Sequence, residues 1–148
     1  HKMGMVDVDR IIQFPHAAIA SDGWVPERNV GSPHPRSFGT NARVLAEFVR
    51  SRKILTIADA IRKMTDLPAR KFSLEGRGRI REGSFADIVI FDPDKIQDHA
   101  TFTKPHAYST GFDLVIVNGQ IEVEKDKATG VRAGRVIRRS AGGGTDKR

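Results

Sequence analysis

The dipeptide Asn118-Gly119 is the feature that most restricts the fold, because it lies between two segments of strand composition. Residues 113–117 are apolar after the first position, and residues 120–124 alternate polar and apolar side chains. Asn-Gly readily adopts the positive φ angles of the two-residue turn that joins antiparallel strands. The sequence therefore predicts a β-hairpin over 113–124.

The two halves of the chain have different hydrophobic patterns. Residues 1–75 carry the periodicity of amphipathic helices, and residues 76–139 have the composition of strands and turns. We expect helices over 6–13, from Gly39 onward, from Thr56 onward and from Pro68 to Phe72. Further strands are expected over 86–91 and 135–138. Residues 140–148 contain three consecutive glycines and no apolar anchor, so they are expected to form a disordered basic tail.

Composition limits the classes of function. The 148 residues match one ordinary domain or a piece of a larger protein, and no apolar run approaches the ~20 residues of a membrane span. Cysteine is absent and no basic-then-apolar leader opens the sequence, so we expect a cytoplasmic protein without disulfides. Residues 125–148 hold eight Lys/Arg against two Asp, which gives +6 of the net +7. They lack aromatic residues, so we expect a solvated terminus and neither a nucleic-acid nor a membrane partner.

Ser21-Asp22-Gly23 is the first candidate site. It follows the small apolar run 17–20, whose composition predicts a strand buried on both faces, and it precedes a polar loop over 25–37. Strand ends and the loops after them form the active face of parallel barrels. A carboxylate there can take a proton from a metal-bound water and return it to a leaving nitrogen, so Asp22 is a candidate catalytic residue and metal ligand. The alternative is an Asp-Gly turn that only caps the next segment.

Two candidate substrate-binding residues, His34 and Arg36, lie in the loop after Asp22. The planar guanidinium of Arg36 can pair a substrate carboxylate at two points, and His34 can line a pocket. The alternatives are an exposed loop histidine and an arginine that only braces its own loop. The five histidines lack His-x-His and His-x-x-x-His spacing, and no serine has the Gly-x-Ser-x-Gly frame. The sequence therefore shows neither a readable metal cluster nor a serine nucleophile.

The order of several segments resembles the end of the barrel in the N-acyl-D-amino-acid deacylases, which are the D-aminoacylases of the amidohydrolase superfamily. The Ser-Asp-Gly motif at 21–23, followed by His-Pro-Arg at 34–36 and Gly-Thr at 39–40, is the part most particular to that family. The Gly-rich stretch and Ala-Asp over 78–87 are shared by amidohydrolases generally. Further similar segments are 7–12, 15–16, 43–45, 64–70, 88–92, 117–119 and 134–139. The resemblance covers nearly all of residues 1–139.

The resemblance implies an α/β fold in which residues 1–75 supply the last strand and helices of a (β/α)8 TIM-like amidohydrolase barrel. Residues 76–139 would then form the carboxy-terminal half of a small β-sandwich. It also implies a zinc-dependent hydrolase that cleaves the amide of an N-acyl-D-amino acid, a small-molecule substrate, with Asp22 as general base and acid.

The family's histidine and cysteine ligands have no counterpart in this sequence. We therefore expect a carboxy-terminal fragment that is inactive alone, with Asp22 sharing any zinc with ligands outside the chain. Two alternatives remain. One is another amidohydrolase, such as a dihydroorotase or hydantoinase, and the other is a non-catalytic interaction module.

Overall fold

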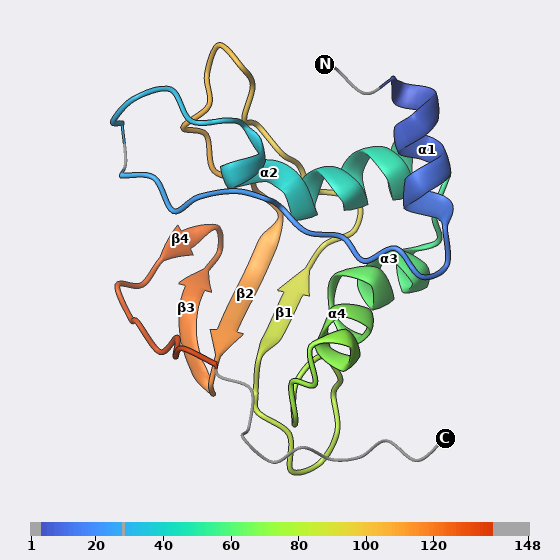
Figure 1. Ribbon diagram of the computed structural model, residues 1–148. Helices are drawn as coiled ribbons and strands as arrows, with labels where there is room; N and C mark the ends of the chain where they lie inside the picture. The colour runs from blue at the N-terminus through green and yellow to red at the C-terminus, as the bar shows by residue number, and fades with distance from the viewer. Residues whose placement is uncertain (1–3, 28, 138–148) are drawn as a thin grey trace.

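The computed structural model describes residues 4–27 and 29–137 of the chain. Helical elements occupy the first half and strands the second, as the hydrophobic pattern predicts (Figure 1). The helical elements are α1 (Met5–Gln13), α2 (Arg36–Arg43), the π-helix η1 (Val44–Ser51), α3 (Ile57–Met64) and α4 (Asp66–Lys71). The strands are β1 (Ile88–Phe91), β2 (Phe112–Val117), β3 (Gln120–Glu124) and β4 (Lys127–Ala128). No helix among the described residues is long and apolar enough to span a bilayer.

The strands form one antiparallel sheet in the order β1-β2-β3-β4. The predicted hairpin is confirmed, because Val117 pairs with Gln120 across the turn. Asn118 and Gly119 adopt φ angles of 47° and 82°, as a two-residue turn with both central residues in the left-handed region requires. In Figure 1, α2 and η1 cross above one end of the sheet, and α3 and α4 lie beside β1.

A second tight turn, which the sequence analysis missed, joins β3 to β4. Its central residues, Lys125 and Asp126, have φ angles of 46° and 64° although neither is glycine. Asp126 stabilises this turn twice. Its Oδ1 accepts the Phe112 N–H at 2.8 Å, and its own N–H donates to the Phe112 carbonyl at 3.0 Å. These two hydrogen bonds to β2 hold Asp126 in the left-handed region, which aspartate tolerates better than most residues.

The predicted strand over 135–138 is wrong for residues 135–137, which have no strand pairing. Side chains, and not a neighbouring strand, hold the segment just before them. The Glu122 carboxylate accepts the Ala133 and Gly134 N–H groups at 2.7 and 3.2 Å, and Asn118 Nδ2 donates to the Ala133 carbonyl at 2.7 Å. Val136 is 86% exposed, so no apolar burial favours a strand there. Arg138 and the predicted tail over 140–148 lie outside the described residues.

The helices follow the predicted periodicity closely. The helix expected over 6–13 is α1, and the one expected from Pro68 is α4. Thr56 caps α3 as predicted, because its Oγ1 accepts the Asp59 N–H at 3.1 Å. The helix expected from Gly39 begins earlier, at Arg36, because Pro35 already has the helical φ of −51° that favours a helix start.

Among the described residues, one buried cluster joins the helices to the ends of the strands. The apolar stripe of η1 packs against α3 and against the connection between β1 and β2. The cluster consists of Ala42, Val44, Leu45, Leu55, Ala60 and Ile96, with Ile12, Ile19, Val49, Ile61, Met64, Phe91 and Phe112 packed around it. This cluster fixes the helices relative to the sheet.

Residues 17–20 pair with no strand within the described chain, and Ala18 and Ala20 are exposed, so the predicted buried strand stays a prediction. Here the segment runs along α3, and the Ile19 N–H donates to the Lys63 carbonyl at 3.0 Å. The small apolar composition therefore corresponds to an unpaired segment that leads from α1 to Asp22.

Candidate active site

The Ser21-Asp22-Gly23 turn and the start of α2 meet in space. The Arg36 Nη2 lies 3.1 Å from the Asp22 Oδ2, so the structure brings two of the three predicted site residues into an ion pair. The Asp22 side chain is 85% exposed, and its φ of 49° lies in the left-handed region. Such a backbone costs a non-glycine residue of order 1 kcal/mol and is enriched at functional sites. Asp22 is thus an accessible carboxylate on a strained turn beside a cation.

Ser37 holds this turn against α2. The Trp24 N–H donates to the Ser37 Oγ at 3.2 Å, and a Cβ at Gly23 would lie only 2.8 Å from the Ser37 Cα. Glycine at position 23 therefore permits the close approach of the two segments. Within the turn, the Gly23 N–H donates to the Ser21 Oγ at 3.2 Å. Ser37 could not be predicted from the sequence, because a single serine in a polar loop carries no spacing signal.

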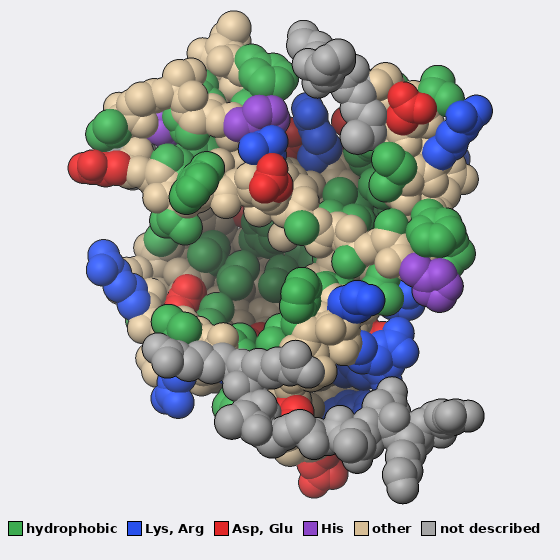
Figure 2. All heavy atoms as spheres, viewed as in Figure 1, with side chains coloured by type: hydrophobic (Ala, Val, Ile, Leu, Met, Phe, Trp, Pro, Cys, Tyr) green, Lys and Arg blue, Asp and Glu red, His purple; other side chains and the backbone are tan. Residues whose placement is uncertain are grey.

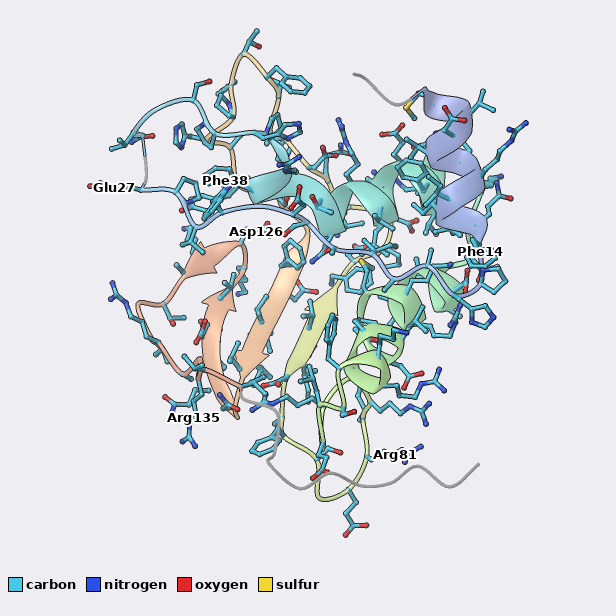
Figure 3. All side chains as sticks on the ribbon, in the orientation of Figure 1. Phe14, Glu27, Phe38, Arg81, Asp126 and Arg135 are labelled. Atoms are coloured by element: carbon cyan, nitrogen blue, oxygen red, sulfur yellow. The ribbon has the colours of Figure 1, made fainter. Side chains whose placement is uncertain are left out.

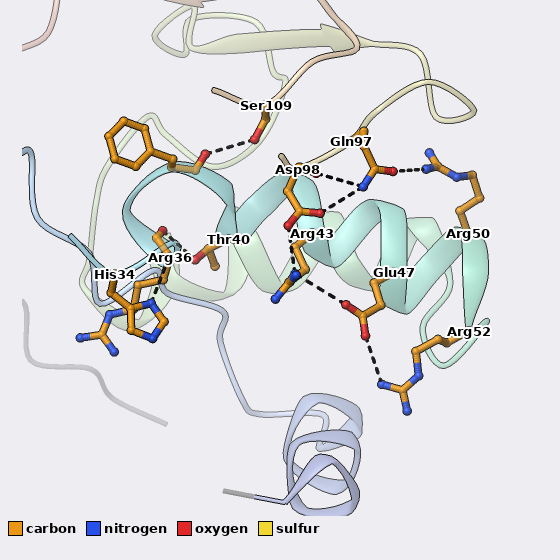
Figure 4. A network of polar contacts seen from close by, with 11 residues as sticks. His34, Arg36, Thr40, Arg43, Glu47, Arg50, Arg52, Gln97, Asp98 and Ser109 are labelled. Carbon is orange, nitrogen blue, oxygen red and sulfur yellow. Dashed lines mark hydrogen bonds and ion pairs between the residues drawn. The ribbon is translucent and has the colours of Figure 1, made fainter. Parts of the chain in front are cut away.

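Arg36 and His34 are linked through the backbone (Figure 4). The Arg36 N–H donates to the His34 Nδ1 at 3.1 Å, and the Arg36 carbonyl accepts the Thr40 hydroxyl at 2.9 Å. The His34 ring also meets the edge of Phe102, with ring centroids 4.9 Å apart. His34 thus caps the first turn of α2 and contacts the long connection between β1 and β2. It is not in the Asp22–Arg36 pair.

An open hollow of about 750 Å³ lies between α2 and the sheet. Arg36 and Ser21 line it on the helix side, and apolar side chains of β2 and β3, including Val115 and Val123, line it on the sheet side. Figure 2 shows the hollow near the centre of the face, with hydrophobic side chains along its walls. Asp22 and His34 are not among the lining residues. The hollow therefore borders the candidate site at Ser21, Arg36 and Ser37.

Aromatic rings support the loop that carries His34. Phe38 makes edge contacts with His106 and Tyr108, with both pairs of centroids 5.5 Å apart. The His106 Nε2 lies 3.0 Å from the Gly31 carbonyl, and the Ser109 hydroxyl donates to the Phe38 carbonyl at 3.1 Å. The connection between β1 and β2 thereby braces the loop over 29–35 from one side.

Polar contacts anchor α2 and η1 to the same connection (Figure 4). The Arg43 Nε lies 3.0 Å from the Asp98 Oδ2, and Arg50 donates to the Gln97 side chain at 2.9 Å and to the Ile96 carbonyl at 2.7 Å. Asp98 and Gln97 are largely shielded from solvent, so these contacts are screened less than surface pairs. The end of α2 and the π-helix η1 are therefore fixed to the connection between β1 and β2.

The described residues do not fit a zinc site by themselves. No group of three or more histidine or carboxylate side chains gathers in this part of the chain, and zinc sites require three or four ligands. Asp22, moreover, faces a guanidinium and not a second ligand. A zinc ion at Asp22 would therefore need ligands from outside the described residues.

Comparison with known proteins shows that this chain is similar to members of one protein family. The model of the amidohydrolase family matches residues 11–123. A D-aminoacylase of Alcaligenes xylosoxydans xylosoxydans is 42% identical over 135 residues, which cover 91% of this chain and 27% of that protein. A dihydroorotase of Endomicrobium trichonymphae is 49% identical, but over only 49 residues, 33% of this chain and 11% of the dihydroorotase.

Two solved structures are similar over the same extent. One is a D-aminoacylase with a binuclear metal centre, with a TM-score of 0.86, 41% identity, and coverage of 93% of this chain and 28% of that one. The other is an N-acyl-D-glutamate deacylase from Bordetella bronchiseptica in complex with zinc and a phosphonate mimic of the tetrahedral intermediate. It has a TM-score of 0.82, 40% identity and the same coverage of 93% and 28%.

The chain spans about a quarter of the length of these deacylase relatives. Within that span the similarity of sequence and of fold extends from the unpaired segment before Asp22 through the helices to the β2–β3 hairpin. The chain therefore belongs to the amidohydrolase family.

Proposed function

We propose that this chain is the carboxy-terminal part of a zinc-dependent N-acyl-D-amino-acid deacylase. The observation that carries the proposal is the ion pair of Asp22 and Arg36 on a braced turn, in a chain that resembles D-aminoacylases over more than nine-tenths of its length. The barrel end and the half-sandwich expected from the sequence belong to this proposal. The antiparallel sheet and the helices before it are compatible with them.

Asp22 is the group that moves the proton in this proposal. Amide hydrolysis adds water to the carbonyl carbon, breaks the C–N bond and delivers a proton to the leaving nitrogen. An exposed carboxylate with a short stem can take the proton from the attacking water and pass it to that nitrogen. The ion pair with Arg36 holds this carboxylate beside the hollow that Arg36 borders.

Arg36 also binds the substrate carboxylate in this proposal. Its Nη2 contacts Asp22, and its side chain is 41% exposed and borders the hollow. A guanidinium carries five N–H donors, so it can hold Asp22 with one edge and the α-carboxylate of an N-acyl amino acid with another. His34 then acts by fixing the backbone of Arg36, and the zinc ligands come from the remainder of the enzyme.

A dihydroorotase-type reaction is the second candidate, since a third of the chain resembles a dihydroorotase at 49% identity. Purified longer protein that contains this segment distinguishes the two. We expect zinc-dependent hydrolysis of N-acetyl-D-methionine and little turnover of its L-enantiomer or of dihydroorotate. Turnover of dihydroorotate alone would replace the deacylase proposal with the second candidate.

A further inference from the structure

Lys63 is fully buried, with no exposed surface, although the proposed reaction does not use it. It lies on α3 three residues after Ala60, which is also fully buried, so both side chains belong to the inward face of the helix. A buried ammonium is costly unless hydrogen bonds replace its water. The burial lowers the pKa of Lys63, while Asp59 raises it and Arg62 lowers it further. The hydrogen-bond acceptors of this ammonium therefore decide whether a lysine can be buried at position 63.

The partners all lie on the unpaired segment that leads to Asp22. Lys63 Nζ donates to the Phe14 carbonyl at 2.5 Å and to the Ala17 carbonyl at 3.3 Å. The Lys63 carbonyl accepts the Ile19 N–H at 3.0 Å, so one residue of α3 holds three points along the segment. Arg62 adds a fourth contact, from Nη2 to the Pro15 carbonyl at 2.9 Å. Figure 3 labels Phe14 and Glu27 at opposite ends of the stretch that contains this segment and the Asp22 turn.

These contacts hold the segment against α3. Residues 17–20 pair with no strand in the described chain, and only Ala20 and Ser21 separate Ile19 from Asp22. Beyond Asp22, the turn is held by Ser37 and Arg36. The Asp22 turn is therefore held from two sides, by contacts of the preceding segment with α3 and by its own contacts with α2.

We propose that Lys63 is a positioning residue that sets the location of the Asp22 turn relative to Arg36, through its hydrogen bonds to the Phe14, Ala17 and Ile19 backbone. The role of Lys63 in catalysis rests on the proposed function of Asp22. The effect of its hydrogen bonds on the location of the Asp22 turn does not. Without the ammonium, the two carbonyls lose their donors and the segment can move away from α3.

The test compares Lys63→Met, which keeps the length of the side chain and removes the donor, with Lys71→Met at an exposed lysine on α4. Amide hydrogen exchange is measured by NMR at Ile19 and Trp24, with the buried Leu45 of η1 as the reference for global opening. In Lys63→Met we expect the exchange rates at Ile19 and Trp24 to increase roughly tenfold more than the exchange rate at Leu45, because the segment opens locally. Lys71→Met should leave all three amides unchanged.

Equal acceleration at all three amides in Lys63→Met would overturn the proposal, since it would show that Lys63 contributes only to global stability. If that variant does not fold, the wild-type chain is tested directly. The Lys63 ammonium should then show slow hydrogen exchange and NOE contacts to the α protons of Phe14 and Ala17, and their absence would refute the anchor. Failure of the deacylase proposal would appear separately, as absent turnover in the longer protein with the Ile19 exchange result unchanged.

Discussion

Replacing Gly23 by alanine perturbs the point where the Asp22 turn meets α2. The added Cβ would lie 2.8 Å from the Ser37 Cα, 3.2 Å from its Oγ and 3.3 Å from its N. Two of these neighbours are backbone atoms of the first turn of α2, so a rotamer change cannot relieve the contact. The two segments must separate, and the Trp24–Ser37 hydrogen bond lengthens or breaks.

The cost combines two effects. Overpacking costs about 1–3 kcal/mol, and loss of a backbone-to-hydroxyl hydrogen bond costs about 1 kcal/mol. Part of the overlap is relieved because the turn is exposed, so we expect Gly23→Ala to lower the free energy of unfolding by about 2 kcal/mol. Separation of the segments should also weaken the Asp22–Arg36 ion pair.

Gly134→Ala is the matched control, because nothing lies within 4 Å of a Cβ built at Gly134 and its φ is not positive. Urea unfolding of both variants, followed by circular dichroism, gives the two free energies. Fluorescence of Trp24, the single tryptophan, reports on the turn. Equal midpoints for Gly23→Ala, Gly134→Ala and wild type would refute the close-approach reasoning.

Three further predictions concern charge and metal. Arg36→Lys in the longer enzyme should raise KM for N-acetyl-D-methionine roughly tenfold and matter little for the neutral amide analogue, and equal losses on both would mean that Arg36 only braces its turn. The 148-residue chain alone should bind no stoichiometric zinc by metal analysis and should not hydrolyse N-acetyl-D-methionine. The hydrogen bond from Arg79 lowers the pKa of Asp66 from 3.8, so the unfolded state binds the proton more readily and stability is lost as the pH falls through the lowered value. Asp66→Asn should therefore reduce the fall of the urea unfolding midpoint at acid pH. An unchanged fall would show that other groups cause the loss of stability in acid.

The β2–β3 hairpin could be predicted from the residues of its turn, but the β3–β4 turn could not. Asn-Gly has a strong intrinsic preference for positive φ, so the signal lies in two residues. Lys125 has no such preference, and the turn is stabilised by two hydrogen bonds between Asp126 and Phe112, fourteen positions earlier in the sequence. A hydrogen-bond partner so far away in the sequence cannot be predicted from the spacing of residues.

The candidate site was predictable in part for a similar reason. Asp22 stood out because of its motif, but an apolar run such as 17–20 has the same composition whether it pairs with strands or rests on a helix. The contact of Gly23 with Ser37 depends on how two segments pack, which single residues do not encode. Lys63 did leave a signal, because it shares the buried face of α3 with Ala60, but a charged residue at such a position is more often assigned to the surface.

The role of Asp22 is the central claim, and one pair of measurements tests it most directly. In the longer protein, kcat for N-acetyl-D-methionine is compared between wild type and Asp22→Ala, with zinc content and urea midpoint measured on the same samples. The Asp22 side chain is 85% exposed and makes a surface ion pair, so folding should be nearly unchanged. The account predicts a loss of kcat of about 10²–10⁴-fold with zinc retained. Wild-type kcat in Asp22→Ala would contradict it and show that the Ser-Asp-Gly turn is only structural.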